Sequence, residues 1–422
     1  MNSPAPARRP TDWNSAAMQA RIRRRYAAER RFRYTGLAAM LLSAAFLAFL
    51  LVTMAANGLR GFTVTEIRLP IDFPRSTLFL DPAALKGFGA DAALAGADIE
   101  GATARAADQA FGTIGGARLL SDGAWLSVRN AIRHDPAILG GRAEIFVPAS
   151  TALDLAAKGH GTPEMDATRA TLAAKGALRT RISTTFLTGS DATDPTLVGV
   201  WGAFKGSLLT MLVTLLLAFP VGVFAALYLE EYAPRNRWTD LIEVSINNLA
   251  AVPSIIFGLL GLAVFLNMMH LPRSAPLVGG LTLALMTMPV IVIAGRNAIK
   301  AVPPSIRDAA LGIGASRVQV VFHHVLPLAL PGILTGTIIG MARALGETAP
   351  LLMIGMRAFI ASPPGGITDP ATVLPVQIFL WSDEVSRGFV EKTSAAIIVL
   401  LAFLMLMNGL AIYLRNRFET RW

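Results

Sequence analysis

The sequence predicts an all-α polytopic membrane protein with six transmembrane helices and an additional α+β insert. The chain has 422 residues, of which 53% are hydrophobic and only 16% charged. Its mean hydropathy of +0.52 is too high for a typical soluble protein. Several apolar runs reach about 20 residues, the length that a helix needs to cross a bilayer. A long polar stretch without such a run separates the first apolar run from the second.

The predicted spans are 35–56, 207–229, 242–269, 277–295, 333–355 and 393–414. The third is longer than a bilayer requires, which indicates tilt or partial burial in protein. The predicted domains are a basic tail over 1–34, the first transmembrane helix over 35–57, the insert over 58–200, a five-helix core over 201–414 with a loop at about 297–331, and a C-terminal tail over 415–422.

The charge pattern predicts the orientation. The formal net charge is +10, and arginines are concentrated before the first apolar run and after the last. Basic residues accumulate on the cytoplasmic side, so both termini should be cytoplasmic and the insert should lie outside. The basic arm is compatible with contact to anionic membrane lipid. We interpret the excess as a topology signal and expect no nucleic acid partner. The first run starts too late for a signal peptide and predicts an uncleaved anchor.

The insert is expected to be a small α+β domain. Segments 67–73 and 143–147 have the apolar content of strands, and the alanine-rich segments 152–158 and 167–181 are typical of helices. The chain has no cysteine, so packing or partner contacts must stabilise this domain.

A polar stretch between the fourth and fifth runs predicts a helix-turn-helix elbow outside the bilayer. Ser305 and Asp308 have the spacing of a capping box that starts a first helix. Gly314 is expected to break that helix, and Ser316 with Gln319 to form a second box.

The same stretch resembles the cytoplasmic loop of ATP-driven importer permeases, whose pattern is E-A-A, three residues, Gly, nine residues, Ile, one residue and Leu-Pro. The matching positions are Asp308, Ala309, Ala310, Gly314, Leu326 and Pro327. Asp308 replaces the usual Glu and His324 the usual Ile. Leu326 and Pro327 are expected to end the second helix. The resemblance implies docking to an ATPase subunit, with Ala309, Ala310 and Ile313 as the apolar face.

From about Trp201 onward the chain resembles the phosphate importer permeases of the A type. The segments NNLAAVPSIIFG at 247–258 and ARALGETAPL at 342–351 carry this resemblance together with the elbow. It implies an importer-type permease core in a bacterial inner membrane. The implied partners are a second permease subunit, an ATP-binding subunit dimer and a periplasmic phosphate-binding protein. ATP would be bound by the partner subunit, so no cofactor is expected in this chain.

The fifth run carries the most distinctive residues. Gly332, Gly336 and Gly340 recur every four residues, a stripe typical of close helix packing. Arg343 and Glu347 lie four apart and can touch. A charge inside a bilayer costs ~3 kcal/mol on insertion scales, so the pair should not face lipid. Arginine suits an oxyanion. The hypothesis is that Arg343 contributes to anion passage while Glu347 and Thr348 tune it; a salt bridge that only holds helices together is the alternative.

Asn247 and Ser254, beside Pro253, could donate hydrogen bonds at a broken helix on the substrate path, although Pro253 is equally consistent with a simple kink. The sequence has no phosphate-binding loop motif, no recognisable hydrolase motif and no cysteine nucleophile. It therefore predicts a transport subunit with no catalytic residues and no metal site. The alternatives left open are a permease for another oxyanion, such as sulfate or molybdate, and a membrane sensor or scaffold without a pore.

Overall fold

The computed structural model describes residues 15–80, 82, 85 and 89–418. It divides into two compact units, Met1–Ala56 and Asn57–Trp422. Most of helix α1 (Ala16–Gly61) belongs to the first unit. Residues 16–34 of the predicted tail are helical and continue into the predicted span without a break. Residues 1–14 of that tail and residues 419–422 of the C-terminal tail lie outside the described residues.

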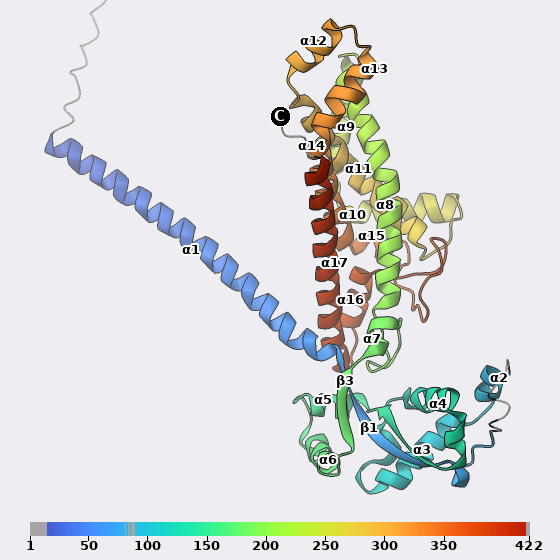
Figure 1. Cartoon of the computed structure of the whole chain (residues 1–422). Helices are drawn as coiled ribbons and strands as arrows, with labels where there is room; N and C mark the ends of the chain where they lie inside the picture. Colours follow the sequence, from blue (N-terminus) through green and yellow to red (C-terminus); the bar gives the residue numbers. More distant parts are fainter. Residues whose placement is uncertain (1–14, 81, 83–84, 86–88, 419–422) are drawn as a thin grey trace, which may run out of the picture. The chain divides into compact units, whose positions relative to one another are not determined.

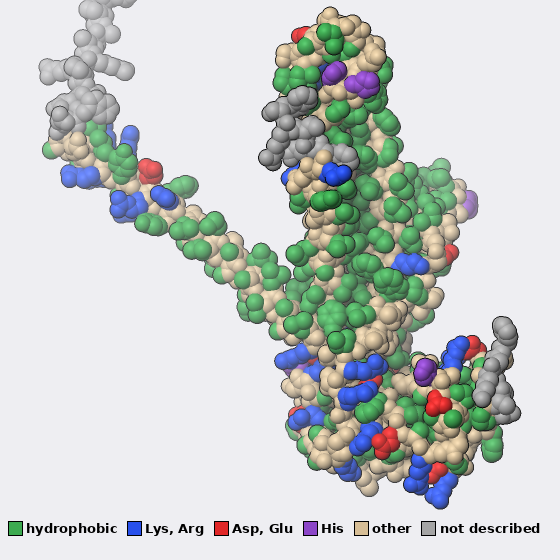
Figure 2. All heavy atoms as spheres, in the orientation of Figure 1, with side chains coloured by type: hydrophobic (Ala, Val, Ile, Leu, Met, Phe, Trp, Pro, Cys, Tyr) green, Lys and Arg blue, Asp and Glu red, His purple; other side chains and the backbone are tan. Residues whose placement is uncertain are grey.

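Five described helices are long and apolar enough to cross a membrane, and a bent pair makes six if it counts as one span. The five are Ala16–Gly61, Trp201–Tyr232, Pro276–Lys300, Arg317–Gly346 and Gly388–Arg417. The predicted fold class is confirmed. Figure 2 shows hydrophobic side chains along the helical part of the second unit, whereas charged side chains are concentrated over the insert.

The insert contains a three-stranded antiparallel sheet in the order β2-β1-β3, built from β1 (Thr63–Asp72), β2 (Arg142–Pro148) and β3 (Leu178–Ile182). The register pairs Ile67 with Val147 and Leu69 with Ile145, which confirms the two predicted strands. The helices around it are α2 (Ala90–Ala95), α3 (Ile99–Phe111), α4 (Ala124–His134), α5 (Thr151–Ala157), α6 (Pro163–Ala174) and α7 (Thr184–Thr188). Short 3-10 turns lie at η1 (Phe73–Arg75), η3 (Gly112–Ile114), η4 (Gly116–Leu119) and η5 (Pro136–Gly140).

The predicted helix over 152–158 is confirmed by α5, but the one predicted over 167–181 is wrong in its last part. Helix α6 ends at Ala174, and Gly176 has a φ of +62°, a conformation that glycine adopts without a steric penalty. The chain then pairs with β1, where Leu178 lies opposite Ile67. Sheet pairing therefore overrides the local helix propensity.

Arginine side chains donate hydrogen bonds to three carboxylates of the insert. Glu66 is buried in β1 and accepts hydrogen bonds from Arg179, at 2.7 Å, and from Arg181 on β3. The hydrogen bond from Arg142 holds the pKa of Asp72 below its usual value. The pKa of Asp98 is likewise lowered, mainly by its hydrogen bond from Arg105. These pairs tie neighbouring elements of the domain together.

Helix α11 (Pro276–Lys300) lies at the centre of the core, between α8 (Trp201–Leu227) and α14 (Leu326–Gly346). α17 (Gly388–Phe418) packs against α14. The small-residue stripe of α14 faces α11, because a Cβ added at Gly336 would lie 2.0 Å from that of Ala294. The predicted close packing is thus confirmed.

The third predicted span is not one straight helix. It consists of α9 (Arg237–Ala250) and α10 (Ser254–Gly261), the latter continuing into a π-helical segment, η7 (Leu262–Met268). The two halves meet at an angle of 100°. Pro253 lies at the break, where its ring and its missing N–H oppose a continuous helix. The prediction of one long third span, tilted or partly buried, is therefore wrong in its continuity: the segment forms two helices.

The fifth predicted span, 333–355, is also interrupted. α14 ends at Gly346, Glu347 has an extended ψ of 124°, and a short helix α15 (Ala349–Met353) follows. Pro350 lies in the first turn of α15, a position where proline favours helix initiation. A further helix, α16 (Leu374–Ser382), packs against α17 and α8. The helical core is shown in Figure 1 with the elbow at one end and the insert at the other.

Candidate functional site

The first helix of the elbow is α12 (Pro304–Gly312). Its N-cap is Pro303, and no side chain caps its first turn. Ser305 lies inside the helix and Asp308 is exposed on it, so the predicted capping box is wrong. Pro304 at the first position explains the start, since its φ is already helical and its missing N–H needs no partner there.

The turn of the elbow is formed as predicted. Gly314 has a φ of +89°, and its N–H donates to the Leu311 carbonyl at 3.0 Å. The second capping box is confirmed: the Ser316 N–H donates to Gln319 Oε1 at 2.8 Å, and the Gln319 N–H donates to Ser316 Oγ at 3.3 Å.

The second helix of the elbow does not end where expected. α13 (Arg317–Gln319) passes through a π-helical segment, η8 (Val320–Val325), into α14. Leu326 and Pro327 lie in the first turn of α14, so the prediction that they end the second helix of the elbow is wrong. The wider hydrogen-bonding pattern of η8 immediately before Pro327 accommodates a residue that has no N–H to donate. The second helix of the elbow is therefore continuous with the fifth span.

The exposed apolar surface of the elbow differs from the predicted one. Ala310 is 4% exposed and packs inward, Ala309 is exposed, and Ile313 is 83% exposed. These three residues do not share a face. The elbow tip, defined here as Leu311, Ile313 and Val318, presents three exposed large apolar side chains. Apolar groups gathered at an exposed position are typical of a contact surface for another protein.

Partly buried ion pairs hold the base of the elbow. Arg307 of α12 donates to Glu231 at 2.7 Å, and Arg296 of α11 donates to Glu230 at 2.5 Å and to Glu243 at 2.7 Å. Glu230 and Glu231 lie on η6 (Tyr228–Tyr232), which ends the second span. The charge pattern of the sequence indicates a topology but does not reveal these pairs between bases and acids. Two adjacent acids closing an apolar run were the available clue.

The predicted contact between Arg343 and Glu347 is present at the α14 break. Arg343 Nε donates to Glu347 Oε1 at 3.4 Å. The Arg343 side chain is 48% exposed and that of Glu347 19%, while Thr348 is half-buried beside them. The pair is thus open to the outside of this chain rather than enclosed by it. An exposed ion pair in an apolar span needs either a second protein surface or water beside it.

The remaining predicted pathway residues lie near the other helix break. Asn247 is exposed on α9, and Ser254 is half-buried at the start of α10. In the part of the chain that the structure describes, neither side chain has a hydrogen bond to the ion pair at the α14 break. The two breaks are nevertheless held together, because a Cβ at Gly258 of α10 would lie 2.7 Å from Pro350 Cα of α15.

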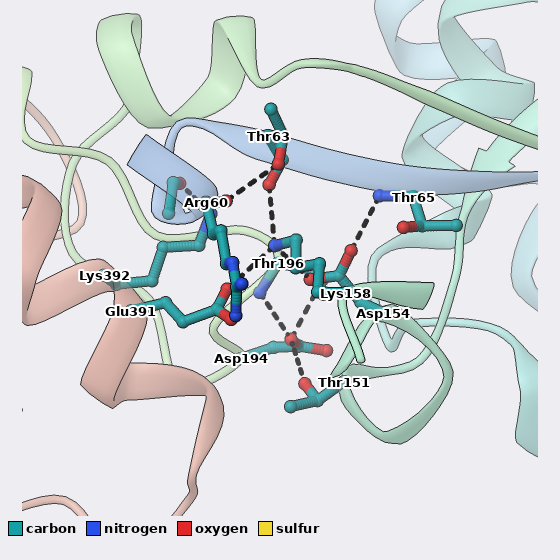
Figure 3. A network of polar contacts seen from close by, with 11 residues as sticks. Arg60, Thr63, Thr65, Thr151, Asp154, Lys158, Asp194, Thr196, Glu391 and Lys392 are labelled. Atoms are coloured by element: carbon teal, nitrogen blue, oxygen red, sulfur yellow. Dashed lines mark hydrogen bonds and ion pairs between the residues drawn. The ribbon is translucent and has the colours of Figure 1, made fainter. Parts of the chain in front are cut away.

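A second polar cluster joins the insert to the core, and Figure 3 shows it. Lys158, just after α5, points toward Glu391 at the start of α17. Its Nζ donates to Asp154 at 2.7 Å, to Glu391 at 3.0 Å and to the Thr63 carbonyl at 3.0 Å. The three charged side chains are at most 10% exposed. This cluster was also missed, because the acid and the lysine before the last apolar run resemble an ordinary helix start.

Lys392 adds a further link at this junction. Its Nζ donates to the Gly61 carbonyl at 2.7 Å and lies 5.1 Å from the centroid of the Phe186 ring. Gly61 itself packs closely on α17, since a Cβ there would lie 2.3 Å from the Glu391 carbonyl oxygen. The last turn of α1, the insert and α17 thus meet at one buried point.

Comparison with known proteins defines the class. Residues 218–420 match the family described as binding-protein-dependent transport system inner membrane component. Residues 19–167 match a family described as a domain of unknown function (DUF3333). The interrupted spans and the elbow lie within the first match, while α1 and much of the insert lie within the second.

Individual relatives narrow the class further. The chain is 32% identical over 215 residues to the phosphate transport system permease protein PstA of Yersinia pestis, covering 50% of this chain and 71% of that protein. It is 35% identical over 156 residues to PstA 1 of Mycobacterium tuberculosis strain CDC 1551, covering 37% and 51%. It is 33% identical over 193 residues to the probable ABC transporter permease YqgI of Bacillus subtilis, covering 43% and 65%. The chain therefore belongs to the PstA-like permeases of the ABC importers. The matched segment covers 51% of the length of the Mycobacterium tuberculosis protein and 65% of the length of YqgI.

Proposed function

We propose that this chain is the permease subunit of an ATP-driven importer that moves inorganic phosphate across the bacterial inner membrane. The observation that carries the proposal is the Arg343–Glu347 ion pair at the interrupted α14. Arginine offers a planar set of donors that can replace part of the hydration of an oxyanion. The names of two relatives, phosphate transport system permease proteins, support phosphate as the substrate.

The exposure of the ion pair supports a pathway shared with another subunit. Arg343 is half exposed in this chain alone, so a second permease subunit facing the α14 break would enclose it. Glu347 and Thr348 then lie at the same position along the pathway and tune the charge presented to the anion. Asn247 and Ser254 are proposed to contribute donors from the neighbouring break between α9 and α10.

The elbow is proposed to dock into a dimer of ATP-binding subunits. Its predicted docking positions are Asp308, Ala309, Ala310, Ile313, Gly314, Leu326 and Pro327, of which Ile313 lies in the exposed elbow tip. ATP would be hydrolysed by those subunits, and a periplasmic binding protein would deliver phosphate. With the elbow on the ATPase side of the membrane, both termini would be cytoplasmic and the insert periplasmic. Closure of the ATPase dimer would then move the elbow and, through the ion pairs at its base, α8 and α11.

The substrate and the role of the ion pair are tested together by uptake. Labelled phosphate uptake is measured in cells that lack this chain and are restored with wild type or Arg343→Ala, with sulfate and molybdate as competitors. We expect wild type alone to restore uptake, and neither competitor to inhibit it. Equal uptake by the variant would reduce Arg343 to a structural role, and no phosphate phenotype would refute the substrate.

The docking role of the elbow is tested separately with Gly314→Asp. The backbone there has a positive φ that a side chain strains. Gly312→Ala is the matched control, because Gly312 has open space around its Cα and lies inside the helix. We expect the first variant to insert normally but to uncouple ATP hydrolysis from uptake. Normal uptake would exclude the elbow as the coupling element.

A further inference from the structure

An arginine-lined cavity lies between two loops of the core. One loop connects η7 to α11, and the other follows α15. The cavity has a volume of about 490 Å³. Its lining consists of Arg273, Ser274, Leu352, Met353, Gly355, Arg357 and Ala358.

The two loops are fixed to each other, so the cavity is a built feature. Ser274 Oγ donates to the Gly355 carbonyl at 2.5 Å. Both residues have positive φ values, +59° at Ser274 and +90° at Gly355. A positive φ at a serine is uncommon and persists only where the surroundings enforce it. The Ala371 N–H donates to the Ser274 carbonyl at 2.8 Å and ties in a third segment. Arg273 and Arg357 flank this connection.

The two arginines have no acidic partner. Both side chains belong to exposed residues, and among the described residues neither forms an ion pair. Arg296, Arg307 and Arg343 of the same core all do. Two guanidinium groups that share one cavity repel each other unless an anion lies between them.

The cavity also has a defined place relative to the proposed pathway. Leu352 and Met353 belong to α15, which directly follows Glu347 and Thr348. α11 begins at Pro276, close to Arg273, and its 25 residues extend about 37 Å toward the elbow. The cavity therefore lies at the end of α11 opposite the elbow, which is the outer side in the proposed orientation.

We propose that Arg273 and Arg357 form an oxyanion-binding vestibule that receives phosphate before it reaches the Arg343–Glu347 pair. This inference rests on the proposed function for the identity of its ligand. The anion bridges the two guanidinium groups, and binding requires no movement of the loops because the cavity is already open.

The test uses the complete transport complex in nanodiscs, without ATP, and modification of arginines by phenylglyoxal read out by mass spectrometry. Inorganic phosphate should slow modification of Arg273 and Arg357 relative to chloride at equal ionic strength. Arg387, an exposed arginine in the loop before α17 that does not line this cavity, should be modified at the same rate in both. Absence of protection by phosphate would overturn the proposal. Protection by the phosphate-free binding protein alone would also overturn it, in favour of a protein-docking surface.

Uptake in proteoliposomes provides the second readout. Arg273→Gln and Arg357→Gln should each raise the KM for phosphate on the order of 10- to 100-fold, the range for losing a charged hydrogen bond. Arg387→Gln should leave the KM unchanged. If wild type transports phosphate and the two variants behave like this control, the vestibule is refuted and the proposed function stands. If phosphate protects the arginines but wild type does not transport it, the binding site stands and the proposed substrate fails.

Discussion

Replacement of Lys158 by methionine should detach the insert from the core. The Lys158 ammonium contacts Asp154 at 2.7 Å and Glu391 at 3.0 Å, and its side chain is 6% exposed. Glu391 Oε1 is buried and has no hydrogen-bond partner among the described residues. Without Lys158, two carboxylates would remain buried with less compensation. Breaking a buried ion pair by removal of one partner costs about 3–5 kcal/mol.

A double-mutant cycle separates the interaction energy between Lys158 and Glu391 from the loss of side-chain packing. Glu391→Gln removes one charge but keeps an acceptor. In combination with Lys158→Met it should therefore recover about 1–3 kcal/mol relative to the sum of the single variants. Lys175→Met is the matched control, since Lys175 is an exposed lysine of the same domain, and should change stability by less than about 0.5 kcal/mol.

The assay is thermal unfolding of the purified chain in its complex, followed by intrinsic fluorescence, together with protease cleavage between the insert and α17. We expect Lys158→Met to lower the midpoint and to expose the junction to protease. Additivity of the two single variants within about 0.5 kcal/mol would refute the reasoning, because it would mean that Lys158 and Glu391 do not interact across the junction.

Three further predictions concern other parts of the chain. Gly336→Leu should prevent close approach of α14 to α11 and abolish stable assembly, whereas Gly409→Leu, at an open position of α17, should assemble normally in the same detergent-extraction assay. Arg307→Met should destabilise the base of the elbow by about 1.5–3 kcal/mol, the range for hydrogen bonds to a charged group, and accelerate its proteolysis. An unchanged cleavage rate would argue against the anchoring role. Because Asp72 and Asp98 have lowered pKa values in the folded insert, their contribution to stability is present above about pH 4 and is lost as the pH falls through the lowered values. Replacing both with asparagine should flatten the acid side of the stability curve.

The sequence predicted most of the elements because their signals are local. Apolar runs define the spans, and the apolar content of 67–73 and 143–147 indicates β1 and β2. The turn at Gly314 and the Ser316–Gln319 box depend on neighbouring backbone atoms only. These features can be read without knowledge of the tertiary structure.

The errors arise where distant segments decide the outcome. β3 forms because β1 offers an unpaired edge, and the face of α12 that turns inward is decided by the helices behind it, so that Ala310 is buried and Ile313 exposed. Likewise, Lys158 and Glu391 are 233 residues apart in sequence. No local pattern indicates which of the many acids in this chain meets which base.

The breaks at Pro253 and Glu347 depend both on a local sequence signal and on distant segments. At Pro253 and at Glu347 the sequence carried a visible signal, a proline or charged residues in an apolar run, yet the lengths of the runs favoured continuous spans. Such breaks leave backbone groups unpaired in a bilayer and persist only where protein or water lies beside them. Their contact through Gly258 and Pro350 places both on one side of the core.

Helix α11 links the functional ends of this arrangement. Arg273 precedes its first turn, Arg296 near its other end is bound by the acids under the elbow, and its middle packs against the small residues of α14. Packed interiors do not deform gradually, and Pro289 inside α11 is the position where this helix could bend. On the proposed function, a displacement of the elbow would reach the arginine-lined cavity through α11. The same helix would then report the state of the ATPase dimer to the site where the anion enters.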